Sequence, residues 1–236
     1  MIKNSKSSRA TVFVPEAVER GEAIRHEVVR RFLREIFRKN LPAGTRLITQ
    51  KLSKQMGVSA TPLREALVEL EGIGMVTIHH NRGAVVAEFG PAELRGIYQV
   101  RRVLESEAAL SACGRIDRAV LDAFREEMSE LASRRSKSAA WLNAVMASDA
   151  RFHSTLAAAC DSPRLAKEIK RYSLLMQTIS EAIGSDYHSK EDGLREHIEI
   201  IDALLAEDPQ RTARAMARHI DATANRALAV MFSSSN

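Results

Sequence analysis

The 236-residue sequence predicts a mainly α fold in two parts, an N-terminal winged helix-turn-helix and a C-terminal all-α bundle of about six helices. Apolar residues recur at helical spacing through most of the chain. Two short strand-like runs, at 75–78 and 84–86, flank a glycine-containing turn as in a β-hairpin. The dipeptide Gly90-Pro91 then separates this mixed region from a purely helical one.

Charge is distributed unevenly between the two parts. Residues 1–90 hold 15 Lys and Arg against 9 Asp and Glu, whereas residues 91–236 hold 20 against 21. Such asymmetry favours a polyanion-binding module joined to a neutral one, although a solvated basic surface without a partner has the same composition.

Composition also excludes some classes of protein. No apolar run approaches the roughly 18 residues that a membrane span needs, so we expect no membrane association. The N-terminal segment is polar, which argues against a secretory signal. The two cysteines, Cys113 and Cys160, lie in alanine-rich helical patterns and fit reduced, buried thiols of a cytoplasmic protein.

The N-terminal domain is expected to span residues 21–89, after a disordered tail at 1–20. A first helix at about 21–39 ends at the turn before Gly44, and a short second helix stops at Gly57, where a left-handed C-cap belongs. The third helix opens near Ser59 with Pro62 in its first turn and carries an apolar stripe. The expected elements are helices at 21–39, 50–56 and 59–72 and strands at 75–78 and 84–86.

The C-terminal domain, 91–232, is expected to bind an effector and to form a dimer. Its helices are separated by glycine, serine and proline breaks, and no strand pattern occurs between them. The expected helices are 91–113, 116–135, 139–160, 163–183, 188–206 and 209–232.

In a winged helix-turn-helix, the third helix enters the major groove of double-stranded DNA. Its apolar stripe faces inward, which leaves Thr61 and Arg64 facing out. Arg64 could pair with a guanine or hold a phosphate. Arg46 and Lys51 could contact phosphates, and the hairpin tip with His80 and Arg82 could reach the backbone or minor groove.

Three sequence motifs, which occur in a fixed order, indicate the type of the first domain. Residues 41–47, 56–67 and 70–76, followed by the Arg82-Gly83 turn, resemble the GntR family of bacterial transcription regulators over about residues 24–88. The resemblance implies a homodimer that binds a palindromic operator. The family usually has Arg where this chain has Ala60, and often where it has Gln50, so we expect one base position to be weakly specified here. The implied DNA contacts are Arg46, Gln50, Lys51, Ser59, Ala60, Thr61, Arg64, His80, Arg82 and Gly83.

A spacing argument predicts a metal site in the bundle. Asp149 and His153 are i and i+4 on one helix, and His197 and His219 lie 11 residues before and after Asp208. If Asp208-Pro209 turns an antiparallel hairpin, the two histidines are level and the four side chains converge. A divalent cation would offset the cost of burying the carboxylate, and three nitrogens with one oxygen suit Zn above all, or Ni, Mn or Fe. The alternative is that each histidine is an ordinary hydrogen-bonded core residue.

The same residues resemble the FCD-type effector domain that often follows a GntR winged helix. The resemblance implies Asp149, His153, His197 and His219 as metal ligands and small organic acids as effectors. Arg101 shares the inward stripe of its helix, so it either holds the effector carboxylate or forms an internal ion pair with Glu105.

The first functional hypothesis is a ligand-responsive transcription regulator, most simply a repressor, in the bacterial cytoplasm and associated with the nucleoid. A second is a metal-dependent hydrolase fused to a DNA-binding domain. Against it, no H-E-x-x-H or G-x-S-x-G motif is present, and helical geometry is expected to turn Glu196 and Asp221 away from the site. We therefore expect no enzyme. A third hypothesis is a ligand-insensitive DNA-binding protein whose metal is structural.

Overall fold

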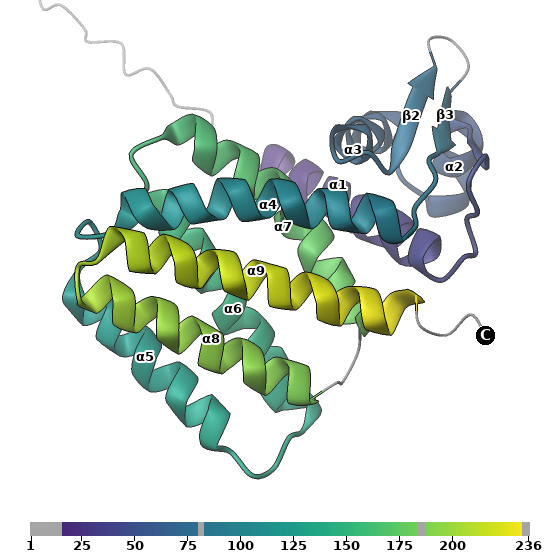
Figure 1. The fold of residues 1–236 in the computed structure, drawn as a ribbon. Coiled ribbons are helices and arrows are strands. Elements are labelled where there is room, and N and C mark those ends of the chain that lie inside the picture. The colour runs from purple at the N-terminus through teal and green to yellow at the C-terminus, as the bar shows by residue number, and fades with distance from the viewer. Residues whose placement is uncertain (1–15, 80–82, 184–186, 233–236) are drawn as a thin grey trace, which may run out of the picture.

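The computed structural model describes residues 16–79, 83–183 and 187–232 and shows a small winged domain beside a larger helical bundle (Figure 1). The chain is mainly helical, as the apolar spacing predicts. The elements of the winged domain are α1 (Glu16–Phe37), β1 (Arg46–Leu47), α2 (Thr49–Met56), α3 (Ala60–Gly72), β2 (Val76–His79) and β3 (Gly83–Val86).

Helix α1 begins five residues before the boundary set by the sequence analysis. Residues 16–20, which were assigned to the disordered tail, belong to α1 because Glu-Ala-Val-Glu-Arg consists mostly of good helix formers. Residues 1–15 of that tail lie outside the described part of the chain.

Helices α2 and α3 form the helix-turn-helix. Gly57 ends α2 at φ 67°, the left-handed C-cap that the sequence predicts. Helix α3 buries the predicted apolar stripe, which comprises Leu63, Ala66, Leu67 and Leu70. This stripe packs on α1, whose Val29 and Leu33 are fully buried. The opposite face of α3 is thereby directed to solvent.

The wing has one more strand than the sequence predicts. Arg46–Leu47 forms the short strand β1 and pairs antiparallel with β3, so the sheet order is β1-β3-β2. Two residues are too few for a period-two pattern, and only pairing with β3 makes them a strand. The pairing fixes the N-terminal end of α2 against the wing.

The bundle contains six helices in the described residues, and their bounds lie within about two residues of the expected ones. They are α4 (Pro91–Ala112), α5 (Arg118–Ser133), α6 (Ala139–Ala159), α7 (Pro163–Ile183), α8 (Tyr187–Leu205) and α9 (Pro209–Phe232). Helix α9 lies between α4 and α8 and contacts both (Figure 1). Helices α6 and α7 are joined by the short connection at 160–162 and pack side by side. No helix among the described residues is long and apolar enough to cross a membrane.

The two parts are joined by packing. Phe89, just before α4, stacks near Phe37 of α1 with ring centroids 5.1 Å apart and near Phe232 of α9 at 6.1 Å. Helix α7 also contacts α1, and Arg34 of α1 forms an ion pair of 3.2 Å with Glu181 of α7. Helix α7 is therefore a direct physical link between the bundle and the winged domain.

Gly83 at the start of β3 gives a test of the wing. Its φ is +82°, and a Cβ there would lie 2.8 Å from the carbonyl oxygen of Leu47 in β1. We expect Gly83→Ala to lower the free energy of unfolding by about 1–3 kcal/mol through backbone strain, and by more through the clash. Gly74→Ala is the matched control, because Gly74 has φ +77° and open space around the added carbon. Equal losses in urea unfolding would show that β1 moves aside freely.

Candidate DNA-binding surface and metal centre

The exposed face of α3 carries the residues that the sequence assigned to the major groove. Thr61 and Arg64 are exposed, and Glu65 is exposed beside them, whereas Ala60 is half-buried. Ser59 occupies the N-cap position without a side-chain capping hydrogen bond. The first turn of α3 thus offers a hydroxyl and a guanidinium to solvent on one face.

The remaining expected contacts lie around this helix. Arg46 on β1 and Gln50 and Lys51 in the first turn of α2 are all exposed. Gly83 begins β3, and His80 and Arg82 lie outside the described residues. The positive charges of Arg46, Lys51 and Arg64 are therefore available to a polyanion.

Three histidines meet inside the bundle, each from a different helix. The Nε2 atom of His197 in α8 lies 3.2 Å from Nε2 of His153 in α6 and 3.2 Å from Nε2 of His219 in α9. The Oδ1 atom of Asp149 lies 3.6 Å from Nε2 of His197 and 3.9 Å from Nε2 of His153. All four donor atoms lie within 4.8 Å of one another, so the predicted convergence is present.

This geometry fits a metal ion. Two nitrogen ligands about 2.1 Å from one ion are about 3.0 Å apart at octahedral angles and about 3.4 Å apart at tetrahedral angles. The two Nε2–Nε2 distances of 3.2 Å fall between these values. His197 and His219 are buried, whereas the Asp149 side chain is 51% exposed, so the cluster is reached from the side of Asp149. The cluster could therefore hold a metal ion with access from one side.

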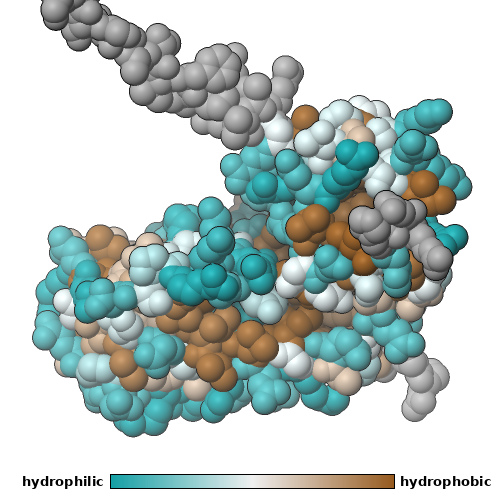
Figure 2. Space-filling model, turned by 90° about the horizontal axis from the view of Figure 1, so that it is seen from above, coloured by the Kyte–Doolittle hydropathy of each residue, from teal (hydrophilic) through white to brown (hydrophobic). Residues whose placement is uncertain are grey.

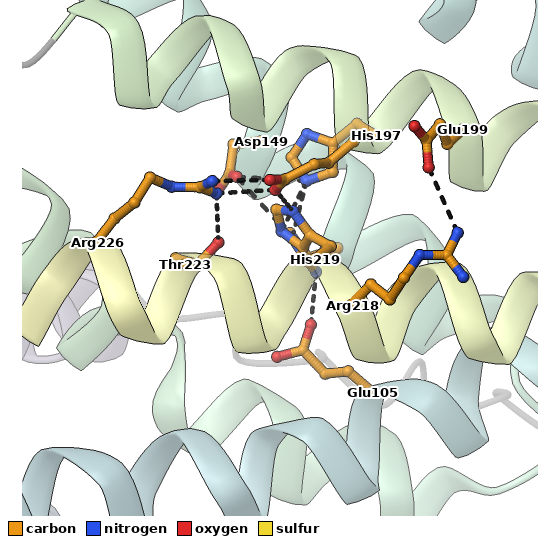
Figure 3. Close-up of polar contacts among 10 residues, drawn as sticks. Glu105, Asp149, His197, Glu199, Arg218, His219, Thr223 and Arg226 are labelled. Carbon is orange, nitrogen blue, oxygen red and sulfur yellow. Dashed lines mark hydrogen bonds and ion pairs between the residues drawn. The ribbon is translucent and has the colours of Figure 1, made fainter.

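Carboxylates orient two of the three rings from behind. Glu105 of α4 forms an ion-pair contact of 2.5 Å with Nδ1 of His153, and His219 donates its Nδ1 hydrogen to Glu196 of α8 at 2.7 Å. Figure 3 shows Glu105, His197 and His219 in this region. A carboxylate at Nδ1 orients the ring so that Nε2 faces the centre of the cluster, as in metal sites generally. His197 is held instead by its contact with the ring of Phe152, at 5.0 Å between centroids.

Each of these carboxylates is in turn held by an arginine. Arg226 donates two hydrogen bonds to Glu196, at 2.7 and 2.8 Å. Arg101 donates from Nε to Glu105 at 2.6 Å. Two Arg–Glu–His chains therefore reach the cluster, one through α4 and the other through α8 and α9. In each chain the arginine offsets the charge of a largely buried carboxylate.

The expectation that Glu196 faces away from the site was wrong. Glu196 points away from its neighbour His197 on α8, but it faces the outer nitrogen of His219 on α9. Asp221 does lie outside the cluster, where it pairs with Arg102 at 3.0 Å. The sequence contained a signal for this contact. Glu196 directly precedes His197, and His197 is level with His219 across the α8–α9 hairpin, so Glu196 lies near His219. Arg226, seven residues after His219, also shares that helix face.

The pKa values of the site follow from burial and these pairs. Burial lowers the pKa of His197 and of His219 below the ordinary value, so both rings are neutral near neutral pH, the form that binds a metal. Burial also opposes the charged form of His153, but the Glu105 carboxylate raises its pKa overall. Burial opposes the charge of Glu196, yet Arg226 and His219 lower its pKa to about 2.

Of the two roles that the sequence left open for Arg101, the structure contains the internal ion pair. It forms the internal ion pair with Glu105 through Nε, and its side chain also lines the cavity that reaches the histidines. Among the described residues, the hydrogen bond of Arg101 is made by Nε. The other two guanidinium nitrogens could donate hydrogen bonds to a ligand in the cavity.

A cavity opens beside the cluster. A first chamber of about 90 Å³ is lined by Asp149, His153, His197 and His219 together with Arg101. A second chamber of about 430 Å³ shares Arg101, Asp149 and His153 with it and continues between α6 and α7. The four candidate ligands thus lie at one end of a space large enough for a small organic molecule.

Sequence comparison identifies both domains. Residues 24–86 match the family described as bacterial regulatory proteins, gntR family, and residues 96–222 match the FCD domain. Because the FCD match covers more than half of the chain, and the gntR match covers the winged domain, this chain belongs to the GntR family and carries an FCD domain. The family consists of DNA-binding transcription regulators and not of enzymes.

Similar proteins with assigned names are transcription regulators. The chain is 27% identical over 191 residues to a protein of Paenarthrobacter nicotinovorans named as a probable D-xylose utilization operon transcriptional repressor, covering 80% of this chain and 81% of that protein. It is 24% identical over 201 residues to the repressor RspR of Escherichia coli, covering 84% and 86%. A regulator of Agrobacterium vitis from the ttuE-ttuC' intergenic region is 32% identical over 133 residues, covering 53% and 75%.

Solved structures share the fold. Escherichia coli McbR/YncC superimposes with a TM-score of 0.63 at 20% identity and covers 90% of this chain and 99% of that one. The Listeria monocytogenes regulator Lar superimposes with a TM-score of 0.59 at 19% identity, covering 86% and 95%. The winged helix followed by a helical domain is therefore the arrangement of this family.

The exposed position of Arg64 gives a test of the DNA surface. We expect Arg64→Ala to weaken binding to duplex DNA by about 1–3 kcal/mol if Arg64 contacts a base edge. Binding should also weaken steeply with salt, because phosphate contacts release counterions. The control is Arg118→Ala on α5, which removes the same charge from a side chain that is 75% exposed in the bundle. Equal fluorescence-anisotropy titrations for both variants would show that Arg64 makes no contact.

Proposed function

We propose that this protein is a ligand-responsive repressor that binds a palindromic operator as a homodimer in the bacterial cytoplasm, on the nucleoid. A divalent metal held by Asp149, His153, His197 and His219 takes part in binding a small carboxylate effector. The observation that carries the proposal is the cluster of three Nε2 atoms and one carboxylate oxygen within 4.8 Å at the end of a cavity. Two relatives named as repressors support the sign of regulation.

Zn is the metal we favour. Ni, Mn and Fe are alternatives, because neutral imidazoles and one carboxylate are suitable ligands for all four ions. Four protein ligands would close a tetrahedral site, so we propose octahedral coordination, which leaves two positions for a chelating carboxylate. The terminal nitrogens of Arg101 offer a second anchor for the same ligand, since Arg101 lines the cavity beside Asp149.

The effector must favour one conformation of the winged domains to alter DNA binding. Helix α7 is the element that connects the two sites. Its Met176 and Ser180 line the cavity, its Glu181 pairs with Arg34 of α1, and its Arg171 lies against Gly72 at the end of α3. A ligand that moves α7 would therefore change the position of α1 and α3.

Dimerisation is supported by the surface of the bundle. Hydrophobic side chains gather on the face of the bundle that Figure 2 shows. Val100 and Val103 of α4 are 42% and 63% exposed. Burying these apolar side chains in an interface would lower their free energy. We infer that α4 contributes to the contact between two copies.

Metal content tests the site. We expect the purified, reloaded protein to hold about one equivalent of a divalent transition metal and His197→Ala to lose it, while salt-dependent DNA binding survives in the winged domain. Glu196→Gln should weaken metal binding by about 10–100-fold, because it removes the carboxylate behind His219. His188→Ala is the control, since its side chain is 95% exposed and lies outside the cluster.

The measurement is elemental analysis together with a chelator competition. Less than about a tenth of an equivalent of metal in the reloaded wild-type protein would contradict the site. Equal metal content in His197→Ala and wild-type protein would contradict the ligand assignment.

Release from DNA tests the effector. Metal-loaded protein on its operator is titrated with monocarboxylates, dicarboxylates and sugar acids, and we expect at least one acid to weaken DNA binding tenfold or more. Arg101→Lys should blunt this response, because it keeps the charge facing Glu105 but loses the planar fork. If every acid leaves DNA binding unchanged although the metal is present, the metal is structural and the repressor is ligand-insensitive.

A further inference from the structure

The larger chamber of the cavity extends away from the metal centre along α6 and α7. It shares Arg101, Asp149 and His153 with the smaller chamber and ends near the α6–α7 connection, where Ala158 and Ala166 line it. Asp149 and Ala158 are nine residues apart on one helix, which corresponds to a length of about 13 Å. A ligand anchored at the metal could therefore extend along this groove.

The wall of this groove is mostly apolar. Helix α6 contributes Ala150, Ala157 and Ala158, whose small side chains leave the space, and α7 contributes Ala166 and Ile169 on the facing wall. Ala157 is buried. These five side chains stabilise an apolar body and offer no hydrogen bonds to it. The lining also includes the polar side chains of Ser154, Lys170, Tyr172 and Gln177.

Two of the hydroxyl groups in the wall are already engaged. The hydroxyl of Ser173 donates to the backbone carbonyl of Lys170 at 2.8 Å, and the hydroxyl of Ser180 accepts from Lys190. A sugar acid would place part of its hydroxyl groups against these alanines and Ile169, which offer no side-chain partner, and each unpaired hydroxyl costs binding free energy. The groove thus favours an apolar body over a polyhydroxylated one.

We propose that the effector is a carboxylate with an apolar body, an aliphatic chain or an aromatic ring system, and not a sugar acid. This proposal rests on the proposed function. The carboxylate binds at the metal and Arg101, and the apolar body lies between α6 and α7 toward their connection. Lengthening the body adds contact with the alanine wall until the groove is filled.

The experiment is isothermal titration of the full-length, metal-loaded protein with butyrate, hexanoate, octanoate and decanoate, beside gluconate and glucarate. We expect affinity to rise with chain length by up to about fourfold per methylene, equivalent to about 0.8 kcal/mol. Gluconate and glucarate should bind no more tightly than butyrate.

Variants then locate the apolar body. Ala166→Leu and Ala157→Leu narrow the groove from its two walls, and each should weaken octanoate binding tenfold or more while metal content and butyrate binding stay within twofold. Ala147→Leu is the matched control, because Ala147 is exposed on α6 and lies outside both chambers. Two blocking variants on different helices keep the test valid if one of them folds poorly.

The outcomes separate this proposal from the proposed function. Tighter binding of gluconate or glucarate than of octanoate would overturn the apolar class but leave a carboxylate-responsive regulator. Octanoate binding that is unchanged in both blocking variants would overturn the groove. If no carboxylate binds to metal-loaded protein, the effector site itself fails, and this proposal fails with it.

Discussion

Three imidazole rings lie close together inside the bundle, and they are contributed or contacted by α4, α6, α8 and α9. Their Nε2 atoms lie 3.2 Å apart in two pairs, too close for protonated rings to coexist. Burial keeps His197 and His219 neutral. The neutral rings of His197 and His219 can therefore present lone pairs toward one point, as metal binding requires.

Holding these rings requires charges that are costly to bury. Glu105 is 6% exposed and lies between Arg101 and His153, so its negative charge is shared by two donors. Glu196 is held in the same way between Arg226 and His219. Removing one member of such a chain would leave its partner charged and unpaired, which destabilises a fold far more than the intact chain stabilises it. The residues behind the histidines are thus as constrained as the histidines themselves.

One helix connects this centre to the DNA-binding domain. Helix α7 lines both chambers of the cavity on one face and contacts α1 on another. The Arg34–Glu181 pair at this contact is partly exposed and contributes little free energy by itself. The packing of α7 on α1, and of Phe89 between Phe37 and Phe232, carries more of the connection. A small displacement of α7 would therefore shift the winged domain through the direct contact of α7 with α1, and not only through the chain segment that connects the two domains.

The sequence by itself determined the elements and the candidate ligands. Helical periodicity and glycine or proline breaks gave bundle helices whose bounds lie within about two residues of those observed. The matched distances about Asp208, with the i, i+4 pair at Asp149 and His153, predicted a cluster whose donor atoms do lie within 4.8 Å. The i, i+4 pair and the level histidines are local or depend on one hairpin, so spacing along the chain is enough to find them, whereas the meeting of α6 with that hairpin depends on the packing of the bundle.

Only the tertiary structure decided what surrounds the ligands. Strand β1 exists because β3 pairs with it, and two residues carry no pattern of their own. Glu105 and Glu196 reach histidines on other helices, and the direction of Glu196 was wrongly predicted from its own helix. The groove between α6 and α7 also depends on how two helices are spaced, because alanines leave a cavity only where the facing wall stays apart. Rotation and separation of helices are set by the packing of the whole bundle, which the periodicity of one segment does not record.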